Sequence, residues 1–160
     1  MIYISPAGLR AIGTIGLTCG VRAPSLARQA VGVWLEPEHP AREIVVLAAS
    51  ELVTNAVRYA DTSSSNADPE AITLELGQGP DYLRLAVTDP GSACSTPSRI
   101  PLQAPSLHAE RGRGLAIVAA LSRNRWGSHR VPPDGLRLVW CHLDLDPSPA
   151  QLEELFRSPI

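Results

Sequence analysis

The chain has 160 residues, of which 44% are hydrophobic, and this length and composition suit one folded domain with a core. The formal net charge of −2 gives no electrostatic footprint for nucleic acid or an anionic membrane. All 14 basic residues are arginine, and a chain without lysine has neither a Walker A phosphate loop nor a Schiff-base lysine.

The cysteines and the apolar segments favour a cytoplasmic protein. Cys19, Cys94 and Cys141 are odd in number, far apart and form no CxxC pair. Such spacing predicts neither a disulfide framework nor a zinc site and favours a reducing compartment. The apolar stretch 12–19 is too short for a membrane span and does not resemble a signal peptide.

The first half of the chain predicts two helices. Residues 1–22 are rich in glycine and too weakly patterned to predict an element. A first helix is expected over 26–35, starting at Pro24 or Ser25. Residues 41–60 give the strongest signal, because apolar residues recur there at helical spacing around most of the circumference.

The second half predicts hairpins around a long loop. Four segments alternate as strands in two hairpins: 72–76 with 82–88, and 125–131 with 136–145. Residues 90–111 are rich in proline, serine and glycine and form a long loop of a kind that is often functional. Further helices are expected over 112–122 and 150–156. This order predicts a single α+β domain, a two-layer sandwich of a mostly antiparallel sheet with helices on one face.

Three short motifs suggest chemistry, and the first lies on the long helix. Glu51, Asn55 and Arg58 recur at i, i+4 and i+7, so they share one face. The Asn55 oxygen suits Mg²⁺, a hard ion, and the Glu51 carboxylate can deprotonate a hydroxyl or water. Taken alone, a solvent-facing polar stripe explains this pattern equally well.

The second motif is Asp89-Pro-Gly91, which follows a hydrophobic strand. Asp89 can accept a hydrogen bond from an exocyclic amine such as adenine N6, and Gly91 lets the backbone approach a flat ligand. Taken alone, an ordinary Asp-Pro-Gly turn is the favoured interpretation.

The third motif opens the helix expected at 112–122. Arg111, Gly112, Arg113 and Gly114 stand where a helix N-terminus exposes N–H groups to an anion, with two arginines to add positive charge. A flexible N-terminal cap is the alternative, since a lone Gly-x-Gly is weak evidence.

In their order and spacing, these motifs resemble the boxes of the Bergerat-fold (GHKL) ATPases, which include gyrase, histidine kinases, the large heat-shock chaperone and mismatch-repair ATPases. Within that superfamily the chain is similar to the small serine/threonine kinases that act as anti-sigma factors, in the form abundant in actinobacteria. Residues 51–60 resemble the N box, 89–91 the G1 box and 112–118 the G2 box. The resemblance runs from about residue 23 to residue 145.

The resemblance implies roles for individual residues. Asn55 would hold Mg²⁺ against the phosphates of ATP, and Glu51 would be the general base. Asp89 would bind the adenine amino group, with Gly91 beneath the ring. These expectations would make Mg²⁺ and ATP the cofactors.

The phosphates would be bound at the third motif. Gly112 and Gly114 would supply N–H groups, Arg111 and Arg113 would add charge, and residues 90–111 would form the ATP lid.

The resemblance also implies partners. Members of this kinase type phosphorylate a serine or threonine of an anti-anti-sigma (STAS-type) protein and hold a sigma factor by partner exchange. A homodimer is a further expectation, whereas direct contact with nucleic acid or a membrane is not expected.

One departure from the family pattern keeps rival functions open. Where the family often has Gly-Lys-Thr, this chain has Leu136, Arg137 and Leu138, and a leucine cannot make the threonine's hydrogen bond. The rivals are a non-catalytic Bergerat-fold module that acts through protein contacts, and an ATPase without a protein substrate. The intact Glu51 and Asn55 pair favours the kinase.

Overall fold

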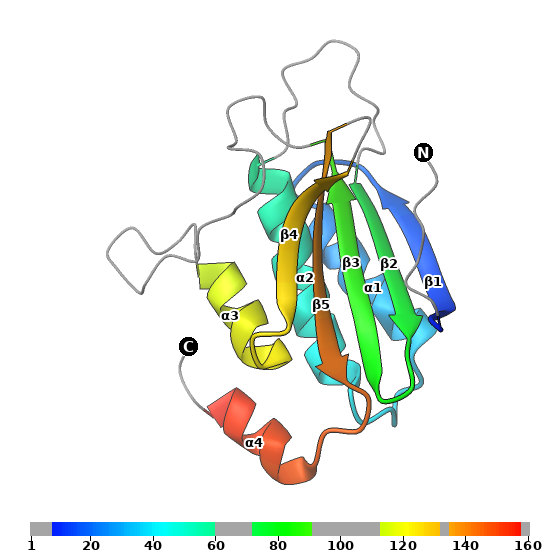
Figure 1. Ribbon diagram of the computed structural model, residues 1–160, viewed down its shortest axis with the longest axis vertical. Coiled ribbons are helices and arrows are strands. Elements are labelled where there is room, and N and C mark those ends of the chain that lie inside the picture. The colour runs from blue at the N-terminus through cyan, green and yellow to red at the C-terminus, as the bar shows by residue number, and fades with distance from the viewer. Residues whose placement is uncertain (1–7, 60–71, 91–112, 132–134, 158–160) are drawn as a thin grey trace.

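A computed structural model describes residues 8–59, 72–90, 113–131 and 135–157. The chain folds into two layers, a sheet and the helices that pack on one of its faces (Figure 1). The strand order is β1-β2-β3-β5-β4, and every neighbouring pair is antiparallel. This architecture confirms the α+β prediction.

The elements follow the expected order with one addition at the start. The strands are β1 (Arg10–Leu17), β2 (Ile72–Gln78), β3 (Tyr82–Asp89), β4 (Trp126–Val131) and β5 (Leu136–Asp144). The helices are α1 (Ala23–Trp34), α2 (Arg42–Tyr59), α3 (Arg113–Ser122) and α4 (Pro149–Arg157). Helix α1 begins at Ala23, before the predicted start. Pro24 is tolerated in the first turn, because the N–H group that proline lacks would have no intrahelical acceptor there.

Strand β1 was not predicted, and its sequence explains why. A bulge between Ala11 and Gly13 shifts the register against β2, so the alternation of side chains is interrupted. A side chain at Gly13 would also collide with the ring of Trp34, which means that the glycine lets α1 pack closely on this strand. The glycines that obscure the strand pattern are therefore part of its packing.

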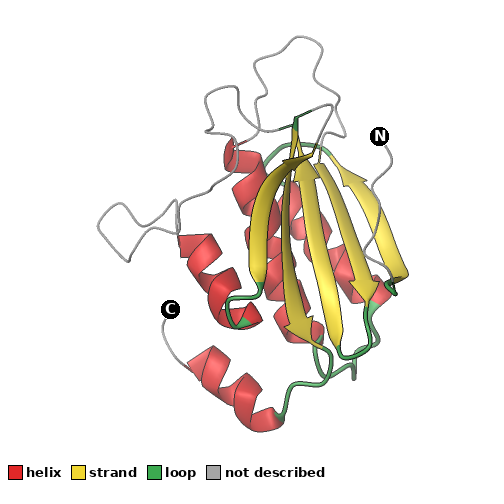
Figure 2. Cartoon of the chain, in the orientation of Figure 1, coloured by secondary structure: helices red, strands yellow, loops and turns green. Residues whose placement is uncertain are grey.

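The core lies between the sheet and helices α1, α2 and α3 (Figure 2). Alternate residues of the central strands point into it. The largest fully buried side chains of β2 and β3 are Ile72, Leu74, Leu76, Leu83 and Leu85. Helix α2 contributes Ile44, Val45, Ala48, Ala49, Leu52 and Val53, all buried, as expected for a helix enclosed on most sides.

The C-terminal helix is more peripheral than the others. No residue of α4 is buried, although Leu152 and Leu155 pack against the edge of the core. Across the described ranges, none of the helices is long and apolar enough to cross a membrane.

Candidate functional site

Helix α2 brings Glu51 against the first turn of α3. The Glu51 Oε2 atom lies 2.8 Å from the point where a Cβ on Gly114 would stand. Only a glycine leaves room for the carboxylate at this distance. The structure therefore places two of the predicted site residues, from separate motifs, in direct proximity.

One helical turn further along α2, Asn55 is almost fully buried, with 5% of its surface exposed. Its Nδ2 atom is buried and has no hydrogen-bond partner among the described residues. A buried amide donor without a partner costs free energy, so a bound ligand that accepts a hydrogen bond would stabilise this position. The same amide offers an oxygen, the ligand atom that Mg²⁺ prefers, and Asn55 therefore fits the predicted metal site.

Strand β3 ends with Asp89, whose side chain is fully buried. Arg137 of β5 stands directly opposite in the antiparallel register. Its Nε and Nη2 atoms both donate to Asp89 Oδ2, at 3.1 and 2.8 Å, and the arginine side chain is only 6% exposed. This is a buried ion pair with charge-assisted hydrogen bonds.

The same guanidinium connects the sheet to α2. Arg137 Nη2 donates to the backbone carbonyl of Asn55 at 3.5 Å, the long limit of a hydrogen bond. Cys19, between β1 and α1, also lies close enough to Asp89 to feel its charge. Burial and, after it, the negative charge of Asp89 raise the pKa of the Cys19 thiol. The end of α2, the end of β3 and the start of β5 thus converge on one place (Figure 1).

Comparison with protein families identifies this arrangement. The profile of the histidine kinase-like ATPase domain matches residues 21–133, well over half of the chain. The chain belongs to the histidine kinase-like ATPase domain family. It therefore carries a GHKL-type ATP-binding domain, as the resemblance of its motifs implied. Among curated proteins, none has a sequence that matches this one significantly.

Part of the expected ATP site of this histidine kinase-like domain is not described. Gly91, Arg111 and Gly112 lie outside the described residues, as does the whole predicted lid except Pro90. Arg113 is the first residue of α3. The described part of the site consists of Glu51, Asn55, Asp89 and Gly114, which all lie within the family match.

Arg137 was not identified as a site residue from the sequence. The effect of the departure from the family's Gly-Lys-Thr pattern was attributed to Leu138 instead. Leu138 pairs with Thr88, one residue before Asp89, so it faces the opposite side of the sheet. A leucine there removes no hydrogen bond from the Asp89 side. The alternation of β5 carried the missed signal, because Arg137 is in phase with the core residues Val139 and Cys141.

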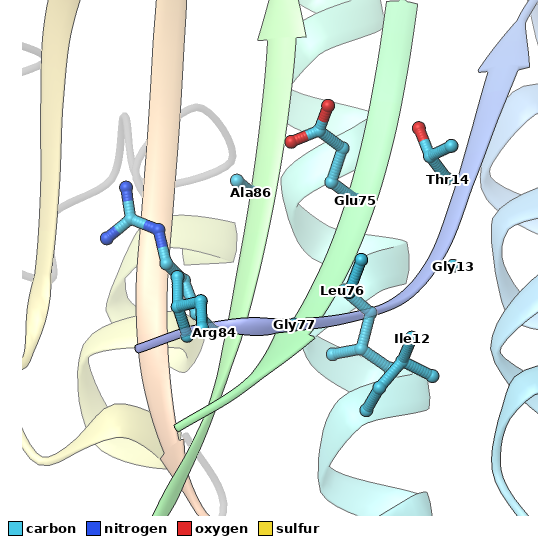
Figure 3. Close-up of a pocket in the computed structure, with 10 residues that line it drawn as sticks. Ile12, Gly13, Thr14, Glu75, Leu76, Gly77, Arg84 and Ala86 are labelled. Atoms are coloured by element: carbon cyan, nitrogen blue, oxygen red, sulfur yellow. The ribbon is translucent and has the colours of Figure 1, made fainter. Parts of the chain in front are cut away.

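A second concave region lies on the outer face of the sheet. A cavity of about 330 Å³ lies between the start of β1 and the outer sides of β2 and β3. Figure 3 shows residues that line it. Small residues and Leu76 line much of it, together with Glu75 and Arg84. Burial raises the pKa of the Glu75 carboxyl, and the charge of Arg84 opposes that rise. This cavity is separate from the Asp89 side of the sheet.

Proposed function

We propose that this histidine kinase-like ATPase domain is an ATP-dependent serine/threonine protein kinase, acting in the cytoplasm as an anti-sigma factor. Its substrate would be a serine or threonine of an anti-anti-sigma (STAS-type) partner. The observation that carries the proposal is the Glu51 carboxylate at the start of α3, one turn of α2 away from the buried amide of Asn55.

Asn55 supplies the metal end of the site. Bound Mg-ATP would supply the phosphoryl group, with the metal neutralising its charge. The Asn55 amide oxygen would ligate Mg²⁺, while the Nδ2 atom, which has no partner among the described residues, would donate to a phosphate or a metal-bound water. One side chain would then satisfy both of its polar atoms.

Glu51 supplies the base. The N-terminus of α3 presents backbone N–H groups and the positive end of a helix dipole, which together favour an anion such as a phosphate. The Glu51 carboxylate lies at that same turn, beside Gly114. It is therefore positioned to accept the proton of a serine or threonine hydroxyl as the hydroxyl oxygen attacks.

The partners follow from the resemblance alone. The N box over 51–60 and the G2 box over 112–118 resemble those of kinases that exchange a sigma factor for a STAS-type protein. We extend this pairing, and a homodimeric state, to the present chain as part of the proposal.

Binding is tested first, by calorimetric titration with ATP in the presence and absence of Mg²⁺. Asn55→Ala should abolish metal-dependent binding while the circular dichroism spectrum is unchanged. Ser50→Ala is the matched control, because Ser50 lies on the same helix but bonds Arg28 of α1. Parent-like Mg-ATP binding by Asn55→Ala would contradict the assignment.

Transfer is tested with labelled ATP and candidate STAS-type proteins, followed by phosphoamino-acid analysis. Glu51→Gln should bind ATP normally and lose transfer by about 10²-fold or more, the usual contribution of a general base. Gly114→Ala should also slow transfer, because the added methyl group would displace the Glu51 carboxylate. If the parent binds Mg-ATP but labels no acceptor, the non-catalytic binding module would be the better interpretation.

A further inference from the structure

We propose that Arg137 is a positioning residue that sets the purine specificity of this site, by holding Asp89 as an ionised and fixed hydrogen-bond acceptor. The inference rests on the proposed nucleotide site, with Asp89 as the residue that contacts the base. Arg137 itself lies beyond residue 133, where the family match ends.

Burial makes the charge of Asp89 depend on Arg137. The carboxylate has no exposed surface and the arginine side chain is 6% exposed. A buried carboxylate with no nearby positive charge tends to take up a proton, whereas an adjacent cation keeps it ionised. An arginine cannot lose its own proton in a protein, so Arg137 supplies a permanent positive charge at this position.

Ionisation decides which base the aspartate can bind. An ionised carboxylate only accepts hydrogen bonds, and a protonated one also donates. The 6-amino group of adenine is a donor, whereas hypoxanthine and guanine carry an acceptor oxygen at the same position. Asp89 kept as a pure acceptor therefore favours adenine and disfavours a 6-oxopurine.

The geometry also fixes the direction of the carboxylate. Both guanidinium nitrogens donate to one oxygen, Oδ2, at 3.1 and 2.8 Å. A carboxylate has about four acceptor positions in all, and the two bonds from Arg137 take positions on Oδ2 alone. The contact of Arg137 with the Asn55 carbonyl holds this arrangement in register with α2.

Because a guanidinium only donates, Arg137 also makes a specific prediction for an amide at position 89. In Asp89→Asn, the side-chain oxygen must face Arg137 and the NH₂ group must face away. The group presented to the base then changes from acceptor to donor. The preference for adenine over a 6-oxopurine should fall by about 10-fold or more, or invert, since mismatched polar groups are strongly rejected.

The experiment is calorimetric titration of the full chain with Mg-ATP and Mg-ITP, two nucleotides that differ at the base. The parent should prefer ATP, and Asp89→Asn should shift the preference toward ITP. Asp89→Asn/Arg137→Met should lose preference for either, because Arg137 then no longer orients the amide. Arg84→Met is the control, since Arg84 lies on β3 with Asp89 but points to the outer face.

Arg137→Met adds a readout that a merely structural role would not move. Its affinity for ATP should fall about 10-fold at the acid end of the pH profile and recover as the pH rises and Asp89 ionises, whereas the parent should be flat over the same range. If Arg137→Met does not fold, Arg137→Lys and Asp89→Asn carry the test. Arg137→Lys keeps the charge, so its pH profile should stay flat.

The outcomes separate this inference from the proposed function. A parent that binds ATP, with an unchanged ATP-to-ITP ratio in Asp89→Asn and a flat pH profile in Arg137→Met, would overturn the role of Arg137 and leave the nucleotide site standing. A parent that binds neither nucleotide at millimolar concentration would overturn both.

Discussion

Charged side chains have different surroundings on the two faces of the sheet. On the inner face, Asp89 and Arg137 form an ion pair with side chains 0% and 6% exposed. On the outer face, Arg84 lies over the Trp140 ring, 5.0 Å from its centroid, and donates to His142 at 3.2 Å. His142 in turn stacks on Tyr82, with ring centroids 4.4 Å apart. Both sets come from β3 and β5, at alternating positions.

The difference shows what burial demands of a polar side chain. Inside, a charge persists only with a partner fixed by hydrogen bonds, so its direction and ionisation are determined. Outside, half-buried rings and a guanidinium share surface with solvent, and each contact is worth little. A charged side chain on the inner face therefore has a more precisely fixed direction than one on the outer face.

The largest expected effect is on the inner face. Arg137→Met should lower the free energy of unfolding by about 3–5 kcal/mol, because it leaves a buried carboxylate without this partner. Chemical denaturation followed by circular dichroism measures it. Arg84→Met should lose less than about 1 kcal/mol, and replacing both inner partners with apolar residues should restore much of the loss. Equal losses for Arg137→Met and Arg84→Met would contradict the comparison.

Packing on the outer face should give the next effect. A Cβ on Gly127 of β4 would stand 2.8 Å from atoms of the Trp140 ring. Gly127→Ala should therefore displace the ring and lower the unfolding free energy by about 1–2 kcal/mol. Denaturation midpoints and tryptophan fluorescence measure the change, with Ser128→Ala as the control on the same strand. A parent-like midpoint and spectrum would show that the ring moves freely.

The effect of acid pH on stability through His142 should be smaller than that of Gly127→Ala. Burial, reinforced by Arg84 and Arg125, lowers the pKa of His142. Near pH 6.5, His142 takes up a proton in the unfolded chain but stays neutral in the folded chain. Stability is therefore lost as the pH falls from about 6.5 toward the pKa of His142 in the folded chain. Solvent screening keeps the effect under about 0.5 kcal/mol. Thermal melts between pH 7 and 5 should fall less in His142→Gln, and an identical slope would exclude this histidine.

Glu75 should have the smallest effect, of opposite sign. Its raised pKa means that the folded chain binds the proton more tightly, so stability falls as pH rises through the ordinary glutamate range toward the folded pKa. At pH 7 the destabilisation caused by the ionised Glu75 carboxylate is fully present. Glu75→Gln should therefore stabilise the protein by about 0.3 kcal/mol, screened as it is by solvent. The gain should vanish in melts at acid pH, and a gain that persists there would have another cause.

Periodicity predicted most of the fold, and charge placement was the harder part. Strong patterns located α2 and both hairpins, and their order predicted a sheet with helices on one face. Strand β1 was not predicted because its bulge and Gly13 interrupt the alternation that identifies a strand. The nearness of Glu51 to Gly114 was expected from motif order. The Asp89–Arg137 pair was not, because it depends on the register between β3 and β5, which a single sequence does not specify.

The position of β5 has a consequence for biosynthesis. Residues 136–144 are made after every other strand, yet β5 lies between β3 and β4 inside the sheet. The ion pair joins residues 48 positions apart. Until this last strand leaves the ribosome, β3 exposes an edge and the guanidinium of Arg137 is not in place. A nascent chain should therefore complete its sheet and form the Asp89–Arg137 ion pair in the same late step.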